Sequence, residues 1–170
     1  MKEIKQKIEI RPPKMSDLNS LLAMINSLVA EKAMITIQKK VALRQEKEYL
    51  ERIIKDKESI HLFLIINGEV MGNGRIAKLK NIRNHIGELG ISIKKEARGL
   101  GLGEKLFKEV SKQAIKKFKL KIITLDVHAR NKIAQSLYVK MGFKKIGTIK
   151  KGIQYYGKYE DYIIMARHID

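Results

Sequence analysis

The sequence contains no cysteine, so the protein has no thiol nucleophile, no thiolate metal ligand and no disulfide. It also lacks any apolar run close to the length of about 18 residues that a membrane-spanning helix needs. The first seven residues, Met-Lys-Glu-Ile-Lys-Gln-Lys, do not contain the apolar segment of a secretory signal peptide. We therefore expect a soluble, cytoplasmic protein without a membrane partner.

Acidic residues are scarce. The chain has 36 Lys and Arg against 18 Asp and Glu, a formal net charge of +18. Such a charge attracts polyanions, including nucleic acid and phosphate-rich ligands, but it also describes a solvated, lysine-rich surface. The densest basic run, residues 112–121, has apolar residues at helical spacing between its lysines. This spacing favours the end of an amphipathic helix over a nucleic-acid-binding tail, so a nucleic-acid partner stays possible but unsupported.

The length of 170 residues fits one domain, 1–170, that buries about 70% of its unfolded surface. Apolar periodicity predicts a helix that Ser16 caps, and Asn67-Gly68 is typical of a hairpin turn. The expected helices cover 16–30, 41–57, 102–118 and 131–141, and the expected strands cover 4–10, 60–66, 85–94, 121–127, 143–150, 159–168 and a run from Val70. This order predicts a three-layer α/β domain, a mixed sheet with flanking helices.

A glycine-rich turn joins the strand that ends near Lys94 to the helix that starts near Leu102. Gly99, Gly101 and Gly103 occupy every second position, where the lack of Cβ atoms lets backbone N–H groups converge on one point. The helix start adds unpaired N–H groups and the positive end of its dipole. The turn therefore predicts a phosphate or pyrophosphate site. Neither the P-loop pattern nor the dinucleotide fingerprint fits, because Glu104 stands where each needs glycine.

Two segments resemble one known family. Arg98-Gly-Leu-Gly-Leu-Gly103 is similar to the coenzyme A loop, [QR]-x-x-G-x-[GA], of the GNAT superfamily of N-acetyltransferases. About 30 residues later, 131–143 resembles the family pattern N-x-x-A-x-x-L-Y-x-[KR]-x-G-F at every key position. The resemblance covers about residues 10–169. It implies the GNAT-like acyl-CoA N-acyltransferase fold and transfer of an acetyl group from acetyl-CoA to a primary amine.

The resemblance also implies where acetyl-CoA binds. Backbone groups of Gly90, Ile91, Ser92 and Ile93 would hold the pantetheine arm and the thioester, and the loop residues Arg98, Gly99, Leu100, Gly101, Leu102 and Gly103 would hold the pyrophosphate. Asn131 would contact the pantetheine arm, and Tyr138 would protonate the departing sulfur. Other interpretations stay open: Arg98 on the surface, Asn131 as a helix N-cap, and Tyr138 as a core residue.

Glu88 is the candidate general base. In an alternating strand it shares a face with Gly90 and Ser92, and GNAT enzymes often carry a glutamate near this position that acts through a water. His85 and His128 are rival candidates, and Glu88 could instead be a surface carboxylate. The four histidines show no metal-ligand spacing, so we expect no metal.

The acceptor is less well defined. We expect an amine on an amino-acid-like small molecule or on a protein, in a groove built from 26–42, 67–84 and 152–160. The net charge disfavours polyamines unless acidic residues gather in that groove. Two alternatives to an enzyme stay open on the same fold, a non-catalytic coenzyme A sensor and a basic nucleic-acid-associated module. The sequence is compatible with a monomer or a homodimer.

Overall fold

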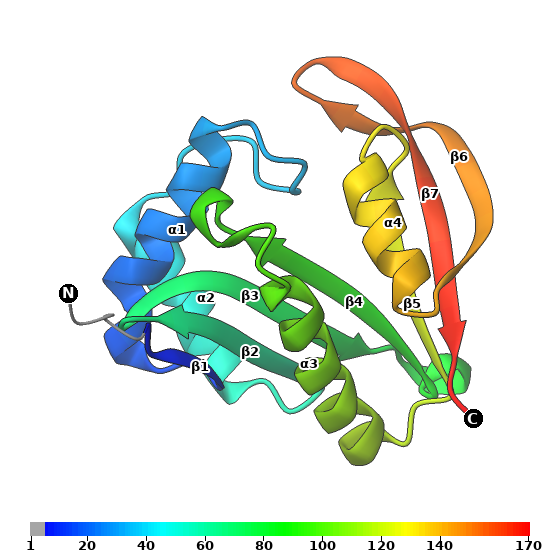
Figure 1. The fold of residues 1–170 in the computed structure, drawn as a ribbon, viewed down its shortest axis with the longest axis horizontal. Coiled ribbons are helices and arrows are strands. Elements are labelled where there is room, and N and C mark those ends of the chain that lie inside the picture. Colours follow the sequence, from blue (N-terminus) through cyan, green and yellow to red (C-terminus); the bar gives the residue numbers. More distant parts are fainter. Residues whose placement is uncertain (1–5) are drawn as a thin grey trace.

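The computed structural model describes residues 6–170, and within them seven strands form one sheet in the order β1-β2-β3-β4-β5-β7-β6 (Figure 1). The strands are β1 (Ile8–Arg11), β2 (Ser59–Ile66), β3 (Glu69–Lys78), β4 (Ile86–Ile93), β5 (Ile122–His128), β6 (Lys144–Tyr155) and β7 (Lys158–His168). The α-helices are α1 (Leu18–Ala30), α2 (Leu43–Lys55), α3 (Leu102–Phe118) and α4 (Lys132–Lys140). This architecture confirms the predicted α/β class and the predicted order of elements.

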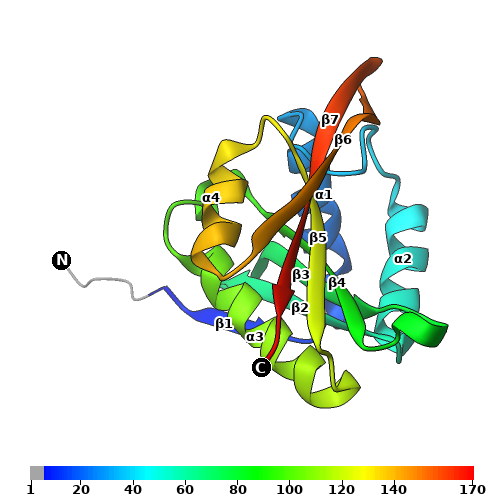
Figure 2. The same ribbon diagram turned by 90° about the vertical axis from the view of Figure 1, so that its right-hand side faces the viewer.

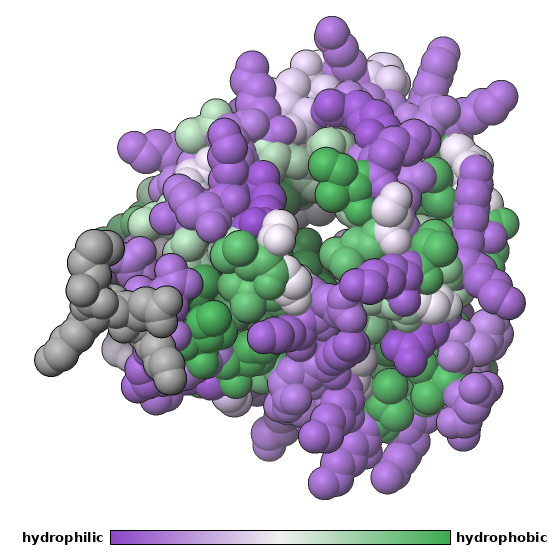
Figure 3. Space-filling view, viewed as in Figure 1, coloured by the Kyte–Doolittle hydropathy of each residue, from purple (hydrophilic) through white to green (hydrophobic). Residues whose placement is uncertain are grey.

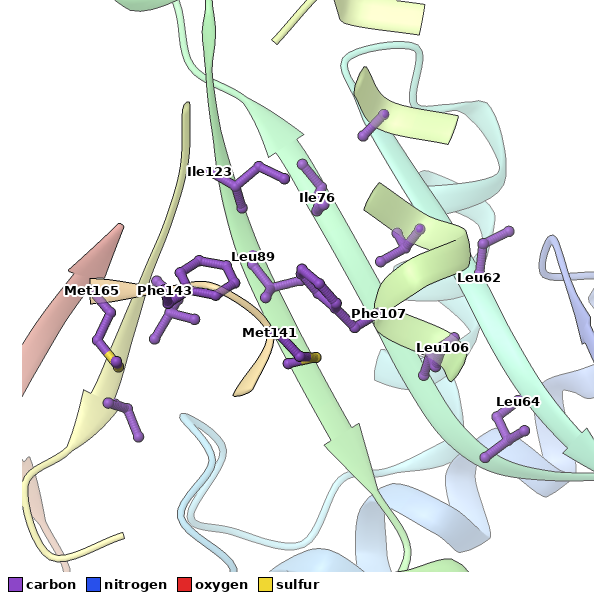
Figure 4. Packing of buried hydrophobic residues seen from close by; sticks show 14 of the residues in the cluster. Leu62, Leu64, Ile76, Leu89, Leu106, Phe107, Ile123, Met141, Phe143 and Met165 are labelled. Carbon is purple, nitrogen blue, oxygen red and sulfur yellow. The ribbon is translucent and has the colours of Figure 1, made fainter. Parts of the chain in front are cut away.

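The helices cover both faces of the sheet (Figure 2). We call the two sides the α3/α4 face and the α1/α2 face. The larger core lies on the α3/α4 face, where α3 buries Leu106 and Phe107 against the sheet (Figure 4). Val110 of α3 is buried in the same core. Phe107 packs edge-on against Phe143, with ring centroids 5.6 Å apart. This core continues under the partly buried Leu137 of α4, so α3 and α4 share one apolar layer.

A second, smaller core lies on the α1/α2 face. Leu21, Met24 and Leu28 recur at helical spacing on α1 and pack with Leu50 of α2 and Phe63 of β2. The two cores use alternate residues of the same strands, since Phe63 belongs to this face whereas Leu62 and Leu64 belong to the other.

Some local predictions are wrong. Ser16 is not a helix N-cap; it lies inside a short 3-10 helix, Met15–Asp17, and α1 begins at Leu18. The strand predicted over 143–150 continues to Tyr155, because β6 pairs with β7 along most of its length despite two irregularities. Part of the strand predicted over 4–10 lies outside the described residues.

No helix within residues 6–170 is both long enough and apolar enough to cross a membrane.

Candidate active site

The central pair of strands separates halfway along its length. β4 and β5 are parallel and pair at Ile86–Ile122, Gly87–Ile123 and Glu88–Thr124. Beyond Glu88, β4 continues to Ile93 on its partner β3, whereas β5 continues on its partner β7. One edge of β4 is therefore free of β5 from Leu89 onward, and its backbone groups can bind an extended, amide-containing ligand. The space-filling view shows a hollow in the surface (Figure 3). In the ribbon seen from the same side, this position lies between the loop that precedes α3 and the helix α4 (Figure 1).

The glycine loop lies at the free end of β4. Gly99 (φ +75°) and Gly101 (φ +71°) both have left-handed backbone conformations, and a Cβ on either would meet no atom of residues 6–170 within 4 Å. The first helical hydrogen bond of α3 runs from Lys105 N to Gly101 O, so the preceding N–H groups of the helix are free for an anion. A loop of this conformation beside a helix start can hold a phosphate group.

The Arg98 side chain turns away from the helix start. Its Nε donates to the carbonyl of Ile93 at 2.8 Å, and its guanidinium pairs with the carboxylate of Glu31. Arg98 thus ties the loop to the end of β4 and to the end of α1. Its charge is largely compensated by Glu31, and the loop is left to present backbone N–H groups.

α4 lies beside the start of α3. The ideal Cβ position on Gly103 is 3.8 Å from Leu137 Cδ2, and Lys140 Nζ is 2.7 Å from Glu104 Oε2. Hydrogen bonds from Lys108 and Lys140 lower the pKa of Glu104 to about 2. Asn131 caps α4, its Oδ1 accepting from Ala134 N at 3.1 Å. The N-cap interpretation of Asn131 is therefore confirmed, and the Asn131 amide nitrogen has no hydrogen-bond partner within residues 6–170.

Tyr138 is half-buried on α4. Its ring packs edge-on against Phe143, with centroids 5.8 Å apart, and burial raises the pKa of its hydroxyl. That hydroxyl forms no hydrogen bond with any residue in 6–170. Packing fixes the ring and leaves Oη available to a ligand, so the core interpretation and the functional one are compatible.

Glu88 lies at the point where the strands separate, on the α1/α2 face with Gly90 and Ser92. It is exposed, and Arg75 is its nearest cation, with Nη2 4.0 Å from Oε1. Asp126 is two residues beyond Thr124 on β5, the strand partner of Glu88. Asp126 is exposed, but partial desolvation, and secondly the charge of Glu88, raise its pKa. Two carboxylates therefore lie on the same face near the opening, close enough for the charge of Glu88 to affect Asp126, and such groups can accept a proton directly or through water.

His128 ends β5 and is buried. Its Nδ1 is 3.1 Å from Glu160 Oε2, which also accepts from Arg130 Nε at 2.8 Å, and its ring packs edge-on against Tyr155. His85 instead lies at the paired end of the strands, where its carbonyl accepts from Lys121 N. At about 3.3 Å per residue it is about 16 Å from Gly90. His85 is thus separated from the opening.

Two of the three segments predicted for the acceptor groove meet across the molecule. Tyr155 Oη donates to the carbonyls of Lys32 and Ala33, the latter at 3.0 Å, and Gln38 Nε2 donates to Gln154 O at 3.0 Å. The tip of the β6–β7 hairpin is thereby fixed to the linker between α1 and α2. In the third segment, Asn67 instead lines a depression together with Leu100 of the glycine loop.

Sequence reasoning missed Asp126, which forms the opening with Glu88. The alternation Thr124, Asp126, His128 along β5 places these polar residues on one face of the strand, and that signal could have found it. Within residues 6–170 no three His, Asp or Glu side chains gather in the manner of a metal site.

The sequence is similar to those of curated N-acetyltransferases. The chain is 30% identical over 107 residues to the L-amino acid N-acetyltransferase AaaT of Escherichia coli K12, which covers 62% of this chain and 66% of that protein. It is 32% identical over 79 residues to an uncharacterized N-acetyltransferase of Methanocaldococcus jannaschii, which covers 46% and 49%. The chain thus spans about half to two thirds of the length of these curated relatives.

Solved structures and a family model lead to the same family. The crystal structure of a ribosomal-protein-alanine N-acetyltransferase from Brucella melitensis has a TM-score of 0.85 at 26% identity, covering 95% of this chain and 99% of that one. Residues 26–143 match the model of the acetyltransferase (GNAT) family. This match covers more than half of the chain, including both segments that carry the sequence resemblance. The chain therefore belongs to the GNAT family of acetyltransferases.

Proposed function

We propose that the protein transfers an acetyl group from acetyl-CoA directly to a primary amine, on an amino-acid-like small molecule or on a protein. The observation that carries the proposal is the separation of β4 from β5 beside a glycine loop that opens onto a helix start. A free strand edge suits the amides of a pantetheine arm, and a helix N-terminus suits a pyrophosphate. One ligand with both groups fits the arrangement.

In this proposal the backbone of the cleft binds acetyl-CoA. The N–H groups from Gly99 to Gly103 receive the pyrophosphate, and the edge of β4 at Ile91, Ser92 and Ile93 receives the pantetheine arm and the thioester. Leu100 and Leu102 contribute backbone groups of the same loop. Arg98 acts by holding the loop against β4, and Asn131 offers its amide nitrogen from the start of α4.

Proton transfer is the chemical task of the side chains. A primary ammonium with a pKa of about 10 must lose a proton before its nitrogen can attack the thioester carbonyl. We assign that proton to Glu88, directly or through water, with Asp126 as its neighbour across the opening. When the carbon–sulfur bond breaks, Tyr138 gives its proton to the leaving thiolate. The acetyl group ends on the amine nitrogen and coenzyme A leaves as a thiol.

The first test is thiol release from acetyl-CoA with a panel of primary amines, together with calorimetry of acetyl-CoA binding. We expect acetyl-CoA to bind better than ATP or NAD and thiol to appear only when an amine is present. Acetyl-CoA binding without thiol release for any amine would favour the coenzyme A sensor. Salt-sensitive DNA binding without acetyl-CoA binding would favour the nucleic-acid module.

Glu88→Gln tests the base. The variant should lower kcat/KM most at neutral pH and recover in part at high pH, where free amine is already present. Glu69→Gln, at an exposed carboxylate in the β2–β3 hairpin, is the matched control and should leave the profile unchanged. An equal loss at all pH values would assign Glu88 to binding or structure and make His128 the next candidate.

A further inference from the structure

A buried carboxylate lies on α2 without a partner. Glu46, Leu50 and Ile53 recur at i, i+4 and i+7, and all three are buried. Leu50 and Ile53 pack into the core of the α1/α2 face, so the same side of the helix carries Glu46 toward the sheet. Only 4% of Glu46 is exposed. Within residues 6–170 it forms no ion pair, and its carboxylate accepts no hydrogen bond.

The surroundings of Glu46 hold a second unsatisfied acceptor. Asn73 Oδ1 is buried and has no hydrogen-bond partner in the described chain. The Tyr49 hydroxyl, one turn along α2 from Glu46, is within hydrogen-bonding reach of the Asn73 side chain. Burial without a partner is costly for an amide oxygen and more so for a carboxylate. The dipole at the start of α2 favours a negative charge there, but it would do so equally for an exposed one.

The two free acceptors lie beside the acetyl-transfer site. In the β3–β4 register Asn73 is opposite Ser92, and Arg75 is opposite Gly90, all on the α1/α2 face. Ser92 and Gly90 are two residues apart, about 7 Å along the strand. The thioester is proposed to lie at Gly90. The distance from there to the Asn73 side chain is therefore about the length of a short aliphatic chain.

No cation of the described chain compensates Glu46. The nearest histidine toward β2, His61, is buried, and burial followed by the charge of Arg75 lowers its pKa to about 4, so it is neutral at physiological pH. Arg75 Nη2 is 4.0 Å from Glu88 Oε1, and Arg75 forms no ion pair with Glu46 in the described chain. What remains around Tyr49 is the carboxyl group of Glu46, whose charge acts on the Tyr49 hydroxyl, and the free amide oxygen of Asn73, whose side chain is within hydrogen-bonding reach of that hydroxyl. The complementary ligand is a cation that donates several hydrogen bonds, which describes an ammonium group.

We propose that Glu46 and Asn73 form a subsite for a second, non-reacting ammonium group of the acceptor, which makes the preferred acceptor a small aliphatic diamine. The reacting amine then lies over Gly90 near Glu88, and the other amine binds Glu46. The net charge of +18 argues against such acceptors only where no acidic residues line the groove. Near this site the groove does contain acidic residues, Glu46, Glu88 and Asp126, so the local charge favours a cationic acceptor. This inference rests on the proposed function for the position of the thioester.

The test compares 1,4-diaminobutane with n-butylamine, which keeps the chain and one amine. Calorimetry without acetyl-CoA measures binding to the wild type, to Glu46→Gln and to Glu48→Gln, an exposed carboxylate two positions along α2 that serves as control. We expect the diamine to bind the wild type and Glu48→Gln at least tenfold more tightly than the monoamine. Glu46→Gln should remove that difference and leave monoamine binding unchanged.

Steady-state kinetics then extend the comparison to turnover. Glu46→Gln should raise KM for the diamine at least tenfold with little change in kcat, and acetyl-CoA affinity should stay unchanged. The proposal is overturned if diamine and monoamine bind the wild type equally, or if Glu46→Gln binds the diamine as well as the wild type does. Failure of the proposed function has a different signature, absent acetyl-CoA binding or absent thiol release, and the calorimetric difference between the amines does not depend on either.

Discussion

The two faces of the sheet use the same strands but differ in the polarity of the side chains that they bury. On the α3/α4 face, buried side chains of β2 to β5 are apolar and interlock with α3. On the α1/α2 face, apolar packing covers β2 and part of β3 and then gives way to polar side chains. Glu46 and His61 are buried there, and within residues 6–170 neither the Glu46 carboxyl group nor His61 Nδ1 has a hydrogen-bond partner. Asn73 is only partly buried, but its Oδ1 is buried and also lacks a partner in that range.

This difference suggests that one face serves mainly the stability of the fold and the other mainly ligand binding. An apolar face gains free energy from every contact and needs no ligand. A face with unsatisfied polar groups gives up stability, and we infer that a bound acceptor compensates it. Residues of the first face should therefore affect mainly the free energy of unfolding, and residues of the second mainly binding and turnover.

The largest effect should come from the α3/α4 face. Phe107→Ala removes a ring that is 1% exposed and packed against Phe143, and it should lower the free energy of unfolding by about 3–5 kcal/mol. Phe118→Ala, at the half-buried end of α3, is the control and should lose clearly less. Urea denaturation measures both. Equal losses would mean that this face is not the main stabilising core.

Tyr138→Phe should separate packing from chemistry on the same helix. The ring that packs on Phe143 is kept and the proton donor is lost. Because a thiol with a pKa of about 8.5 is already a fair leaving group, kcat should fall about 100-fold, the low end for acid catalysis, with unchanged stability. Wild-type turnover with Phe at this position would remove Tyr138 from the mechanism.

Much of the fold could be predicted from local pattern. The bounds of α3 agree with the predicted 102–118 because a glycine loop precedes a strongly periodic helix. β6 was predicted too short, because its lysines and Gly152 do not alternate with apolar residues. Its last residues are ordered by pairing with β7, as at Ile153 and Glu160, a tertiary effect that sequence periodicity does not show.

The site could be predicted only where a motif marks it. The glycine loop and the segment from Asn131 to Tyr138 are such motifs. The burial of Glu46 could not be predicted, because the run Gln-Glu-Lys-Glu is typical of the solvated side of a helix. The compensation of Arg98 by Glu31 joins residues 67 positions apart and was equally inaccessible. In both cases the role of a charge depends on what the fold brings beside it.

A smaller effect is expected at the glycine loop, which belongs to neither face. Gly101→Val adds a branched side chain where the pyrophosphate is proposed to approach, and acetyl-CoA affinity should fall about tenfold, or about 1.4 kcal/mol. Valine is also strained at φ +71°, so Gly157→Val, at φ +78° in the β6–β7 turn, is the control. Calorimetry should show weaker binding only for Gly101→Val. Unchanged affinity in a folded Gly101→Val protein would contradict the assignment of the loop.

The smallest expected effect is a gain in the free energy of unfolding. Burial raises the pKa of Glu46, so its carboxyl group contributes most to stability below the pKa it has in the unfolded chain, and that contribution is lost as pH rises through the pKa in the folded protein. Glu46→Gln removes the charge that burial disfavours. The variant should match the wild type at low pH and become more stable as pH rises, by about 0.5–1 kcal/mol at neutral pH.

Glu48→Gln, exposed on the same helix, should stay within about 0.5 kcal/mol of the wild type throughout. Urea midpoints across this pH range measure the difference between each variant and the wild type, so carboxylates common to both cancel. A variant that is less stable at neutral pH would show that Glu46 supports the fold, and the contrast between the two faces would then not hold at this residue.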